Sequence, residues 1–426
     1  MCFNIVIYIA NTLNYLYFSV KLGEKILTKN EKEKKYGPQT IGIHMGSEGK
    51  NSQHGPVNTP IYASSTFAYP TVKEGGLRFS GESNGYVYGR LGNPTVRDIE
   101  LRLAKLDEGD DALLLGSGMA AVSTMIFTIL KKGDHLIADI SLYGGTHSLF
   151  THRLGEYGIE VDFVDATQPE QVSKLVKPNT KLIYFETPTN PTLRIISIKD
   201  IVTIAKKHNI LTAIDSTFMS PILMQPILMG VDIVIHSVTK YLNGHSDVLA
   251  GVIISNQSII DECKLTSVHH GGILGPFEAY LIGRGLKTLR IRIEEHEKNA
   301  KSVGEYLSKH PKVNNLQYIG DPNHPQHKLA KSQQKGFGSM MTFELQGDFN
   351  DAMLFIDSLE IATRAVSLGG VETLISHPAS TTHSIISEED RLRAGITDTL
   401  FRLSVGIEEV EDIIDDFDNA FNKLTK

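Results

Sequence analysis

The feature that most limits the possible folds of this chain is a series of short apolar runs between residues 93 and 285. Runs of four or five residues alternate with longer segments of helical periodicity, and they cover residues 112–115, 135–138, 161–164, 182–185, 211–214, 231–235 and 250–254. Continuous short apolar runs indicate strands that are buried on both faces, and helical connections let neighbouring strands run parallel. We therefore predict an α/β domain with a mainly parallel sheet that is covered by helices on both sides.

The segments on either side of this core differ from it in composition. Residues 37–92 are rich in glycine, serine, asparagine and proline, which favour extended backbone and turns, and we predict an arm that contacts a neighbouring subunit. Residues 286–426 begin and end with helical patterns, and apparent strands lie between them at residues 340–345 and 401–405. We predict a smaller α+β domain there, so that the large domain spans residues 93–285.

The first 20 residues are apolar and aromatic, yet they match neither a signal peptide nor a membrane-spanning helix. Asn4, Asn11 and Asn14 interrupt the apolar sequence, and no basic residue precedes Lys21. A signal peptide carries positive charge before its apolar part, and a spanning helix of about 20 residues rarely contains three amides. We therefore treat residues 1–36 as an appended segment of unknown role, with a membrane anchor as the minor alternative.

Charge and cysteine content exclude several classes of protein. The chain of 426 residues has a formal net charge of −7, so it lacks the basic surface that nucleic-acid binding requires. Cys2 and Cys263 are its two cysteines, which excludes a disulfide framework and C-x-x-C zinc spacing and suits the reducing cytosol. His269 and His270 lie in a polar stretch and are interpreted as solvated loop residues. We expect a cytoplasmic protein that acts on a small molecule and binds no metal.

Two polar side chains follow successive apolar runs and suggest the chemistry. The run 211–214 ends at Asp215, and the run 231–235 leads through a polar segment to Lys240. Ligands bind beyond the carboxyl ends of parallel strands, where both side chains are expected. A lysine can hold the aldehyde of pyridoxal 5′-phosphate (PLP) as a Schiff base, and an aspartate can keep the pyridine nitrogen protonated. The pair therefore indicates a PLP site.

Hydroxyl groups and glycines near these residues suit a phosphate. Ser237 and Thr239 precede Lys240 and can bind phosphate oxygens, although a polar strand end has the same pattern. Residues 116–121 (GSGMAA) follow an apolar run and open a helical pattern, so their N–H groups can face an anion, although a tight turn is the simpler explanation. Residues 237–240 also match the S-x-x-K pattern of serine acyl-enzymes, but the S-D-N and K-T-G partners of that class are missing.

Tyr143 and Arg402 are candidates for contacts with the cofactor ring and with the substrate. Tyr143 precedes Gly144 and Gly145, which leave space for a planar group. Arg402 lies within the apolar run 401–405, where a guanidinium needs a partner such as a carboxylate. An ordinary buried tyrosine and a structural ion pair are the alternatives.

Seven ordered motifs make the chain resemble the Cys/Met metabolism family of PLP-dependent enzymes from about Gly42 to the C-terminus. They are residues 88–90 (YGR), 92–95 (GNPT), 117–121 (SGMAA), 143–146 (YGGT), 186–191 (ETPTNP), 215–217 (DST) and 237–245 (SVTKYLNGH). The resemblance implies a PLP-dependent transferase fold of type I, like that of aspartate aminotransferase. It also implies a homotetramer built from dimers, in which the arm of one subunit completes its neighbour's active site.

The resemblance further implies a cofactor-binding role for each matching residue. The phosphate would be bound across the subunit boundary by Tyr88 and Arg90, and within the subunit by Gly118, Met119, Ser237 and Thr239. The ring would be bound by Tyr143, which stacks on it, by Asn190 at the ring oxygen, by Asp215 at the ring nitrogen, by Thr217, and by Lys240 through the Schiff base.

Substrate contacts and chemistry follow from the same resemblance. Ser367 and Arg402 would hold the substrate α-carboxylate. Lys240 would move protons at Cα and Cβ, and Tyr143 would protonate the leaving group. Family members that act on cystathionine typically carry glutamate just before the Ser-Leu-Gly-Gly motif, where this chain has Val366. An apolar residue suits the thioether of methionine, because an unpaired buried ammonium is unfavourable.

We therefore predict a methionine γ-lyase-like enzyme that converts L-methionine to methanethiol, 2-oxobutanoate and ammonia. Residues 78–86 and 374–380 also resemble those of methionine γ-lyases. Gly145 argues against this prediction, because methionine γ-lyases usually have cysteine at that position. Cystathionine γ-synthase, cystathionine γ-lyase and O-acetylhomoserine sulfhydrylase are therefore alternatives. The motifs around Tyr143 and Lys240 disfavour an aminotransferase, and the occupied catalytic positions disfavour an inactive relative.

Overall fold

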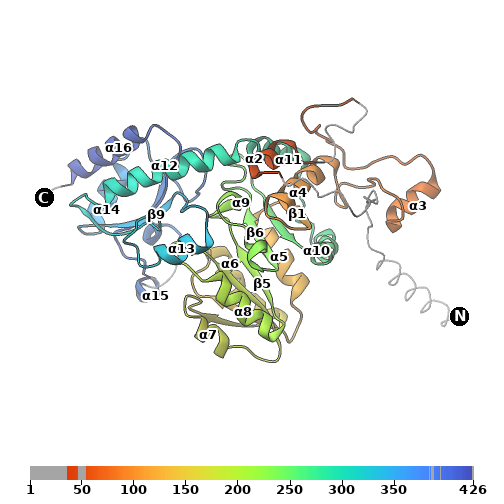
Figure 1. Ribbon diagram of the computed structural model, residues 1–426, viewed down its shortest axis with the longest axis horizontal. Coiled ribbons are helices and arrows are strands. Elements are labelled where there is room, and N and C mark those ends of the chain that lie inside the picture. The colour runs from red at the N-terminus through yellow and green to blue at the C-terminus, as the bar shows by residue number, and fades with distance from the viewer. Residues whose placement is uncertain (1–35, 47–53, 383, 385–387, 394, 425–426) are drawn as a thin grey trace.

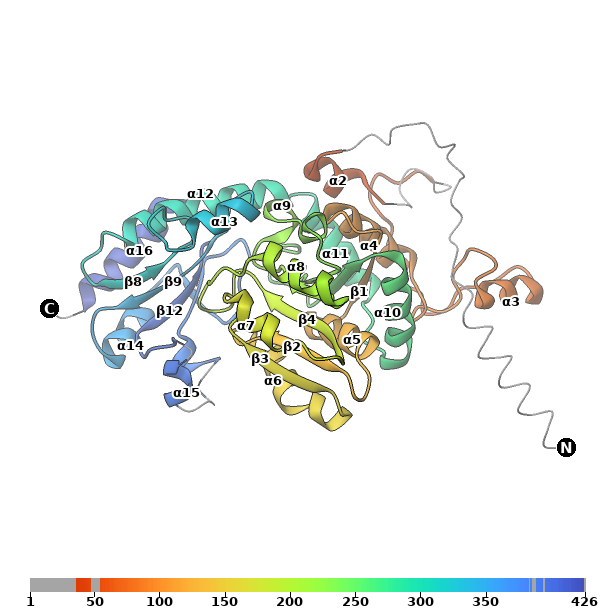
Figure 2. The same cartoon turned by 60° about the horizontal axis from the view of Figure 1, so that its bottom comes forward.

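The computed structural model describes residues 36–46, 54–382, 384, 388–393 and 395–424 of the chain (Figure 1). These residues form two sheets that lie side by side along the long axis, each with its own helices (Figures 1 and 2). The segment predicted over residues 1–36 lies outside the described residues, apart from Tyr36. In the described part of the chain, no helix is long and apolar enough to cross a membrane.

Seven of the described strands form the larger sheet, in the order β1-β7-β6-β5-β4-β2-β3. Their bounds are β1 Asp111–Leu115, β2 His135–Asp139, β3 Glu160–Val164, β4 Thr180–Glu186, β5 Leu211–Asp215, β6 Ile233–Ser237 and β7 Gly251–Ser255. Strands β2 to β6 pair in parallel, whereas β7 is antiparallel to both of its neighbours. The prediction of a mainly parallel sheet is confirmed.

The central residues of most of these strands are apolar because both faces of the sheet are covered. Along β1, Ala112 and Leu114 belong to one core, and Leu113 and Leu115 belong to the other, because successive side chains point to opposite faces. The first core is closed by α4 (Pro94–Leu106), α8 (Ile198–His208) and α11 (Pro276–Leu286), and the second by α5 (Gly118–Ile129), α6 (Gly144–His152) and α10 (Gln257–His270). The sheet is thus the middle layer of three (Figure 2).

Some details of this region differ from the prediction. Strand β6 begins at Ile233, two residues later than expected, because the Asp232 carboxylate accepts hydrogen bonds from the backbone N and Oγ1 of Thr212 at 2.8 and 2.7 Å. His269 and His270 are exposed as expected, but they form the last turn of α10 and not a loop. The remaining connections contain η1 (Leu154–Tyr157), α7 (Pro169–Lys174), α9 (Ser220–Leu223) and η2 (Pro226–Met229).

The smaller sheet follows in the C-terminal part of the chain, in the order β10-β11-β12-β9-β8. Its strands are β8 Val313–Gln317, β9 Met340–Leu345, β10 Thr363–Arg364, β11 Leu374–Ser376 and β12 Leu400–Ser404. The accompanying helices are α12 Leu289–Leu307, α13 His327–Gln333, α14 Phe349–Asp357, η3 Pro378–Ser380, α15 Glu388–Arg393 and α16 Val410–Lys423. The strands predicted at residues 340–345 and 401–405 are β9 and β12.

Helix α12 connects the two halves of the molecule (Figure 1). Its first turns contribute Leu289 and Ile293 to a core of the large sheet, and its last turns contribute Val303 and Leu307 to the core of the small sheet. A single helix of 19 residues is therefore part of both domains.

The range predicted as an extended arm contains two short helices. Helix α2 (Pro38–His44) packs against α4, α11 and α12, whereas α3 (Val72–Ser80) projects from the body of the molecule (Figure 1). The prediction of extended backbone was therefore wrong for these two segments. Proline at the first turn of α2 and Thr71 at the N-cap of α3, which accepts from Glu74 N, are start signals that the glycine-rich composition obscured.

Candidate active site

Lys240 lies in the turn that follows β6, between the two sheets. Its Nζ donates a hydrogen bond to the Ser367 hydroxyl at 2.8 Å, so the lysine of the large domain meets a residue of the small domain. Burial, with a smaller contribution from the Arg402 charge, lowers the pKa of Lys240 to about 8. A lysine with this pKa has a much larger neutral, nucleophilic fraction near pH 7 than an exposed lysine.

Asp215 ends β5 and lies beside Glu186, which ends β4. The two residues are register partners across the parallel pair, and the Asp215 Oδ1 accepts from Thr217 N at 2.9 Å. Burial raises the pKa of Asp215, while the hydrogen bonds from Thr217 and the charge of His236 oppose the rise. Burial, together with the neighbouring Asp215, raises the pKa of Glu186 well above its usual range. A cationic ring nitrogen would relieve the desolvation of this carboxyl pair.

Glu186 is a further residue of this site, for which the sequence predicted no role. Its Oε1 accepts a hydrogen bond from the backbone N of Tyr143 at 2.8 Å, so this carboxyl connects the end of β4 to the start of α6. The signal was present in the pattern, because β4 is one of the parallel strands whose carboxyl ends share an edge with Asp215. The strand order needed to use that signal is not apparent from the sequence.

Tyr143 is the N-cap residue of α6, and its side chain is half exposed at the same edge of the sheet. Gly145 lies close to its ring: a Cβ at this position would come within 2.6 Å of Tyr143 Cε1 and 3.1 Å of Met119 Sδ. The absence of a side chain at Gly145 thus permits the observed position of the Tyr143 ring, and a cysteine there would require the ring to move.

The predicted phosphate-binding residues gather at the start of α5. Ser117 caps this helix by accepting from Ala120 N at 3.0 Å, which leaves the N–H groups of Gly118 and Met119 outside the helical ladder. A Cβ at Gly118 would come within 3.1 Å of the Ser237 side chain, so the backbone can approach Ser237 closely. Backbone N–H groups at a helix N-terminus beside a serine hydroxyl suit a phosphate group.

Two threonines hold this cradle in place. Thr217 Oγ1 accepts a hydrogen bond from Ser237 N at 2.8 Å and thereby joins the ends of β5 and β6. Thr239 Oγ1 accepts from Ala250 N at 2.9 Å and donates to the Ala250 carbonyl at 3.3 Å. Among the described residues, the Ser237 hydroxyl makes no hydrogen bond, so it is available to a ligand.

Arg402 is buried on β12 and reaches toward Lys240 from the small domain. Its guanidinium donates to Asn190 Oδ1 at 3.0 Å and to the carbonyls of Val366 and Ser367 at 2.9 and 3.3 Å. Within the described part of the chain it has no carboxylate partner, which contradicts the structural ion pair considered from the sequence. Burial lowers the pKa of Arg402 to about 10, and a carboxylate ligand would compensate for its desolvation.

A cavity of about 340 Å³ opens beside these groups. It is lined by Thr239, Ser246, Asp247, Val248, Leu249 and Ser367, so it lies between the phosphate cradle and the small domain. Val366, the residue that precedes Ser367, keeps its side chain 58% exposed.

Tyr88 and Arg90 contact other parts of the chain. Tyr88 is exposed and forms an isolated bridge with Thr66. Arg90 donates to the carbonyl of Val268 in α10 at 2.7 Å and lies 5.6 Å from the centre of the Tyr88 ring. The other predicted residues lie at one edge of the large sheet or, in the case of Ser367 and Arg402, contact this edge from the small domain, whereas Tyr88 and Arg90 are exposed on the arm.

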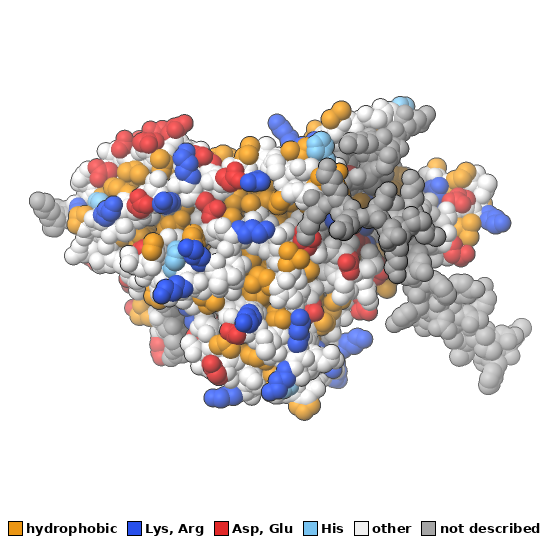
Figure 3. All heavy atoms as spheres, viewed as in Figure 1, with side chains coloured by type: hydrophobic (Ala, Val, Ile, Leu, Met, Phe, Trp, Pro, Cys, Tyr) orange, Lys and Arg blue, Asp and Glu red, His pale blue; other side chains and the backbone are white. Residues whose placement is uncertain are grey.

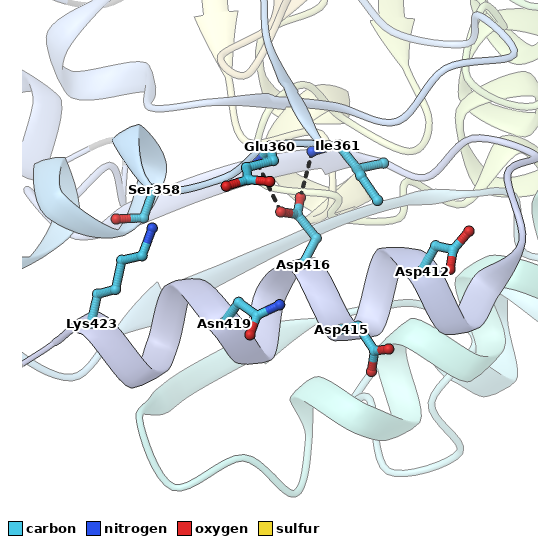
Figure 4. A pocket seen from close by; sticks show the side chains of 8 residues that line it. All are labelled: Ser358, Glu360, Ile361, Asp412, Asp415, Asp416, Asn419 and Lys423. Atoms are coloured by element: carbon cyan, nitrogen blue, oxygen red, sulfur yellow. Dashed lines mark hydrogen bonds between the residues drawn. The ribbon is translucent and has the colours of Figure 1, made fainter.

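A second hollow lies on the small domain and has a structural explanation. Acidic side chains gather at the end of the molecule that carries α16 (Figure 3). The hollow at this end has a volume of about 370 Å³ (Figure 4). It is lined by Ser358, Glu360, Ile361, Asp412, Asp415, Asp416, Asn419 and Lys423. The Asp416 carboxylate accepts from the backbone N of Glu360, Ile361 and Ala362 at 2.8 to 3.0 Å, so it anchors the segment before β10. No group of described residues has the composition of a metal site.

The geometry of the first site therefore fits PLP. It offers an amine with a lowered pKa, a buried carboxyl pair for a cationic nitrogen, an aromatic ring, and a phosphate cradle. It also offers a buried guanidinium for a carboxylate.

Comparisons with known proteins agree with this geometry. The model of the family described as Cys/Met metabolism PLP-dependent enzymes matches residues 39–422. An L-methionine gamma-lyase of Fusobacterium nucleatum subsp. polymorphum is 46% identical, with 92% of this chain and 99% of the relative covered. A cystathionine gamma-lyase of Bacillus subtilis is 42% identical, with 91% and 99% covered.

A solved structure shares the fold as well. Cystathionine gamma-lyase from Lactobacillus plantarum, complexed with L-serine, superposes with a TM-score of 0.85 at 38% identity and covers 91% of this chain and 99% of its own. The match extends over both sheets, so it confirms the predicted α/β fold with a smaller C-terminal α+β part. The chain belongs to the Cys/Met metabolism family of PLP-dependent enzymes, and PLP is its cofactor.

Proposed function

We propose that this enzyme catalyses γ-elimination of L-methionine, in which methionine and water give methanethiol, 2-oxobutanoate and ammonia. The observation that carries the proposal is the position of Val366. Its carbonyl accepts from Arg402, its neighbour Ser367 accepts from Lys240, and its side chain is exposed. An apolar side chain at this point favours an uncharged thioether over the distal ammonium of cystathionine.

The relatives support the same substrate. Proteins named L-methionine gamma-lyase from Fusobacterium, Treponema and Porphyromonas are 44 to 46% identical to this chain over at least 92% of its length. Their names describe those proteins, and the apolar residue at position 366 is the reason to extend the activity to this chain.

The proposed roles of the site residues follow from their contacts. PLP supplies the aldehyde that binds the substrate amine and the ring that accepts electrons from Cα. The Lys240 amine, whose pKa is about 8, accepts the proton of substrate Cα and delivers a proton to Cβ. Asp215 keeps the ring nitrogen protonated, and Arg402 with Ser367 binds the α-carboxylate. Tyr143, at the open edge of the site, donates the proton that the leaving thiolate takes up.

The remaining site assignments concern the cofactor. We propose that the N–H groups of Gly118 and Met119 bind its phosphate together with Ser237 and Thr239. Asn190 would contact the ring oxygen, and Thr217 supports the cradle from behind.

We also propose that the enzyme is a cytoplasmic homotetramer with shared active sites. Tyr88 and Arg90 are exposed on the arm and would reach the phosphate bound by a neighbouring subunit. In this arrangement residues 37–92 form the arm, residues 93–285 the large domain and residues 286–426 the small domain.

The test of the proposed substrate is the substitution Val366→Glu. A carboxylate at this position would pair with the distal ammonium of cystathionine and would lie unpaired beside the thioether of methionine. We expect the ratio of kcat/KM for methionine to that for cystathionine to fall by about tenfold or more, because a hydrogen bond to a charged group is worth about 1.5–3 kcal/mol. The measurement is a comparison of both substrates in parallel, with 2-oxobutanoate release as the common readout.

Val366→Gln is the matched control, because it has the shape of glutamate without its charge. It should lower methionine turnover modestly without improving that of cystathionine. An unchanged preference in Val366→Glu would show that this residue does not determine which substrate is used.

Gly145 favours cystathionine γ-lyase as a second candidate function. The family resemblance implies glycine at this position in cystathionine enzymes, and here the absence of a side chain permits the observed position of the Tyr143 ring. Faster turnover of cystathionine than of methionine by the unmodified enzyme would support this candidate over the first.

A further inference from the structure

Arg292, at the end of the first turn of α12, is a buried cation that binds backbone carbonyls. Its Nη1 donates to the carbonyl of Tyr241 at 2.8 Å, and its Nη2 donates to the carbonyls of Gly285 at 2.9 Å and Leu242 at 3.5 Å. Among the described residues it has no carboxylate partner, and burial lowers its pKa to about 10. Tyr241 and Leu242 directly follow Lys240, so this guanidinium holds the backbone that carries the lysine.

The lysine segment is shaped to receive this side chain. Gly244 has a φ of +75°, and a Cβ on it would come within 1.9 Å of Arg292 Nη1. Its N–H donates to the carbonyl of Lys240 at 2.8 Å and closes the turn around the guanidinium. Any larger residue at Gly244 would displace Arg292 from the turn.

One and two turns further along α12, two side chains on the same face are hydrogen-bonded to backbone carbonyls of the small domain. His296 Nδ1 lies 2.7 Å from the Val405 carbonyl, and Asn299 Nδ2 donates to the carbonyls of Gly406 and Glu408 at 3.2 and 2.7 Å. A carbonyl only accepts, so Nδ1 carries the proton. Burial lowers the pKa of His296 to about 4, so the ring is neutral at ordinary pH. Val405 follows β12, the strand that carries Arg402.

His296 also touches the lysine segment. Its ring packs edge-on against the ring of Tyr241, with centroids 5.5 Å apart. The Tyr241 hydroxyl is hydrogen-bonded to Ser339 at 2.8 Å, and the Ser339 carbonyl accepts from Val405 N at 3.1 Å. The backbone after Lys240 and the backbone after Arg402 are therefore bound to one row of side chains spaced four and three residues apart on one helix.

We propose that this row, Arg292, His296 and Asn299, is a positioning device that sets the distance between the Lys240 amine and the Arg402 guanidinium. The proposal builds on the functions proposed above for Lys240 and Arg402. None of the three residues touches the reacting atoms. They act by fixing two backbone segments from different domains, and a displacement of about 1 Å in such a geometry can lower a rate by about 100-fold.

The pKa of Lys240 reports on this distance, because a charged group lies near the amine. Arg402 is the charged group that acts on Lys240, and the other titratable groups at this edge of the sheet are Asp215, Glu186 and Tyr143. If the lysine segment relaxes away from Arg402 and admits water, both causes of the lowered pKa weaken. The pKa of Lys240 then rises from about 8 toward its ordinary value of 10.5.

The experiment compares Arg292→Met with Arg290→Met on the same helix. Arg290 is half exposed and pairs with Glu294, so its removal controls for the loss of one arginine from α12. The full-length apoenzyme is mixed with PLP, and the rate of covalent attachment, followed by visible absorbance, is measured against pH. Only the neutral amine attacks the aldehyde, so the rate rises with pH through the pKa of Lys240.

We expect a midpoint near pH 8 in the unmodified enzyme and in Arg290→Met. In Arg292→Met the midpoint should rise by about one pH unit, and kcat should fall about tenfold. Arg292→Lys keeps a charge but cannot bind several carbonyls at once. Its attachment midpoint and its kcat should therefore lie between those of the unmodified enzyme and those of Arg292→Met. If Arg292→Met does not yield folded protein, the lysine variant carries the comparison.

His296→Phe tests the other end of the row. It keeps a ring against Tyr241 but removes the N–H that holds Val405, so the strand with Arg402 should shift while Lys240 stays in place. We expect KM to rise about tenfold with a smaller change in kcat, the opposite pattern to Arg292→Met.

A merely structural role predicts that the variants melt at a lower temperature while their attachment midpoint and their kcat/KM stay unchanged. That result would overturn the proposal. The attachment assay contains no amino-acid substrate. Its outcome therefore stands apart from the choice of methionine, and a failure of the proposed substrate would leave the midpoint shift intact.

Discussion

Lys240→Ala is expected to lower kcat by at least about 1,000-fold. The substitution removes the amine that attaches PLP and also the group that moves the protons at Cα and Cβ, and proton transfer by a positioned side chain alone contributes about 100- to 10,000-fold. It also removes the hydrogen bond to Ser367. The measurement is single-turnover release of 2-oxobutanoate at saturating PLP. A second measurement is borohydride reduction followed by mass spectrometry, which should find PLP bound to the peptide that contains Lys240 in the unmodified enzyme alone.

The exposed Lys301 provides the matched control. Lys301→Ala should retain both the activity and the borohydride-stable link. Persistence of that link in Lys240→Ala would identify another lysine as the attachment point. A soluble, PLP-binding variant without the link, in contrast, would separate loss of chemistry from loss of fold.

Arg402→Met should have the second largest effect, on substrate binding. Arg402 is a buried guanidinium whose present partners are an amide oxygen and two carbonyls, and a carboxylate would add a bond to an opposite charge. Truncating one partner of a buried charge pair costs about 2–5 kcal/mol, so kcat/KM should fall by at least about thirtyfold, mainly through KM. Steady-state kinetics with L-methionine give this value.

Methionine amide distinguishes carboxylate binding from a general disturbance of the site. The unmodified enzyme should prefer methionine strongly over the amide. Arg402→Met should lose that preference, because the substitution weakens binding of the carboxylate and does not weaken binding of the amide. Arg364→Met, on the half-exposed Arg364 of β10, is the control. An Arg402→Met enzyme that still discriminates against the amide would place the carboxylate elsewhere.

The fold of the large domain could be predicted because its physical cause is local. Most strands are buried on both faces, so they are visible as short apolar runs without reference to their neighbours. The late start of β6 arose because Asp232 satisfies the backbone of a different strand through its side chain. The order of the strands is set by packing between distant segments, and no local pattern contains it.

The same distinction applies to the candidate site. Lys240, Asp215 and Tyr143 could be assigned because each follows an apolar run at the edge where ligands bind. Glu186 was missed because its meaning depends on β4 lying next to β5. Arg292 was missed for a different reason: within the charged pattern of α12, a buried arginine looks like its exposed neighbours.

The arm shows a third limit of the sequence. Tyr88 and Arg90 were assigned to the phosphate only through family resemblance, and their contacts within one chain lie with Thr66 and α10. Their proposed role requires a second subunit. Interactions between identical chains leave no pattern in the sequence that separates them from interactions within one chain.

The position of α12 has a consequence for how the protein unfolds. This helix contributes Leu289 and Ile293 to one core and Val303 and Leu307 to another, and its polar row binds backbone from both domains. If either sheet melts, α12 loses half of its contacts, and the surviving sheet loses a wall of its core. The melting of one domain therefore destabilises the other, and the two halves of the subunit should lose their structure in one cooperative calorimetric transition.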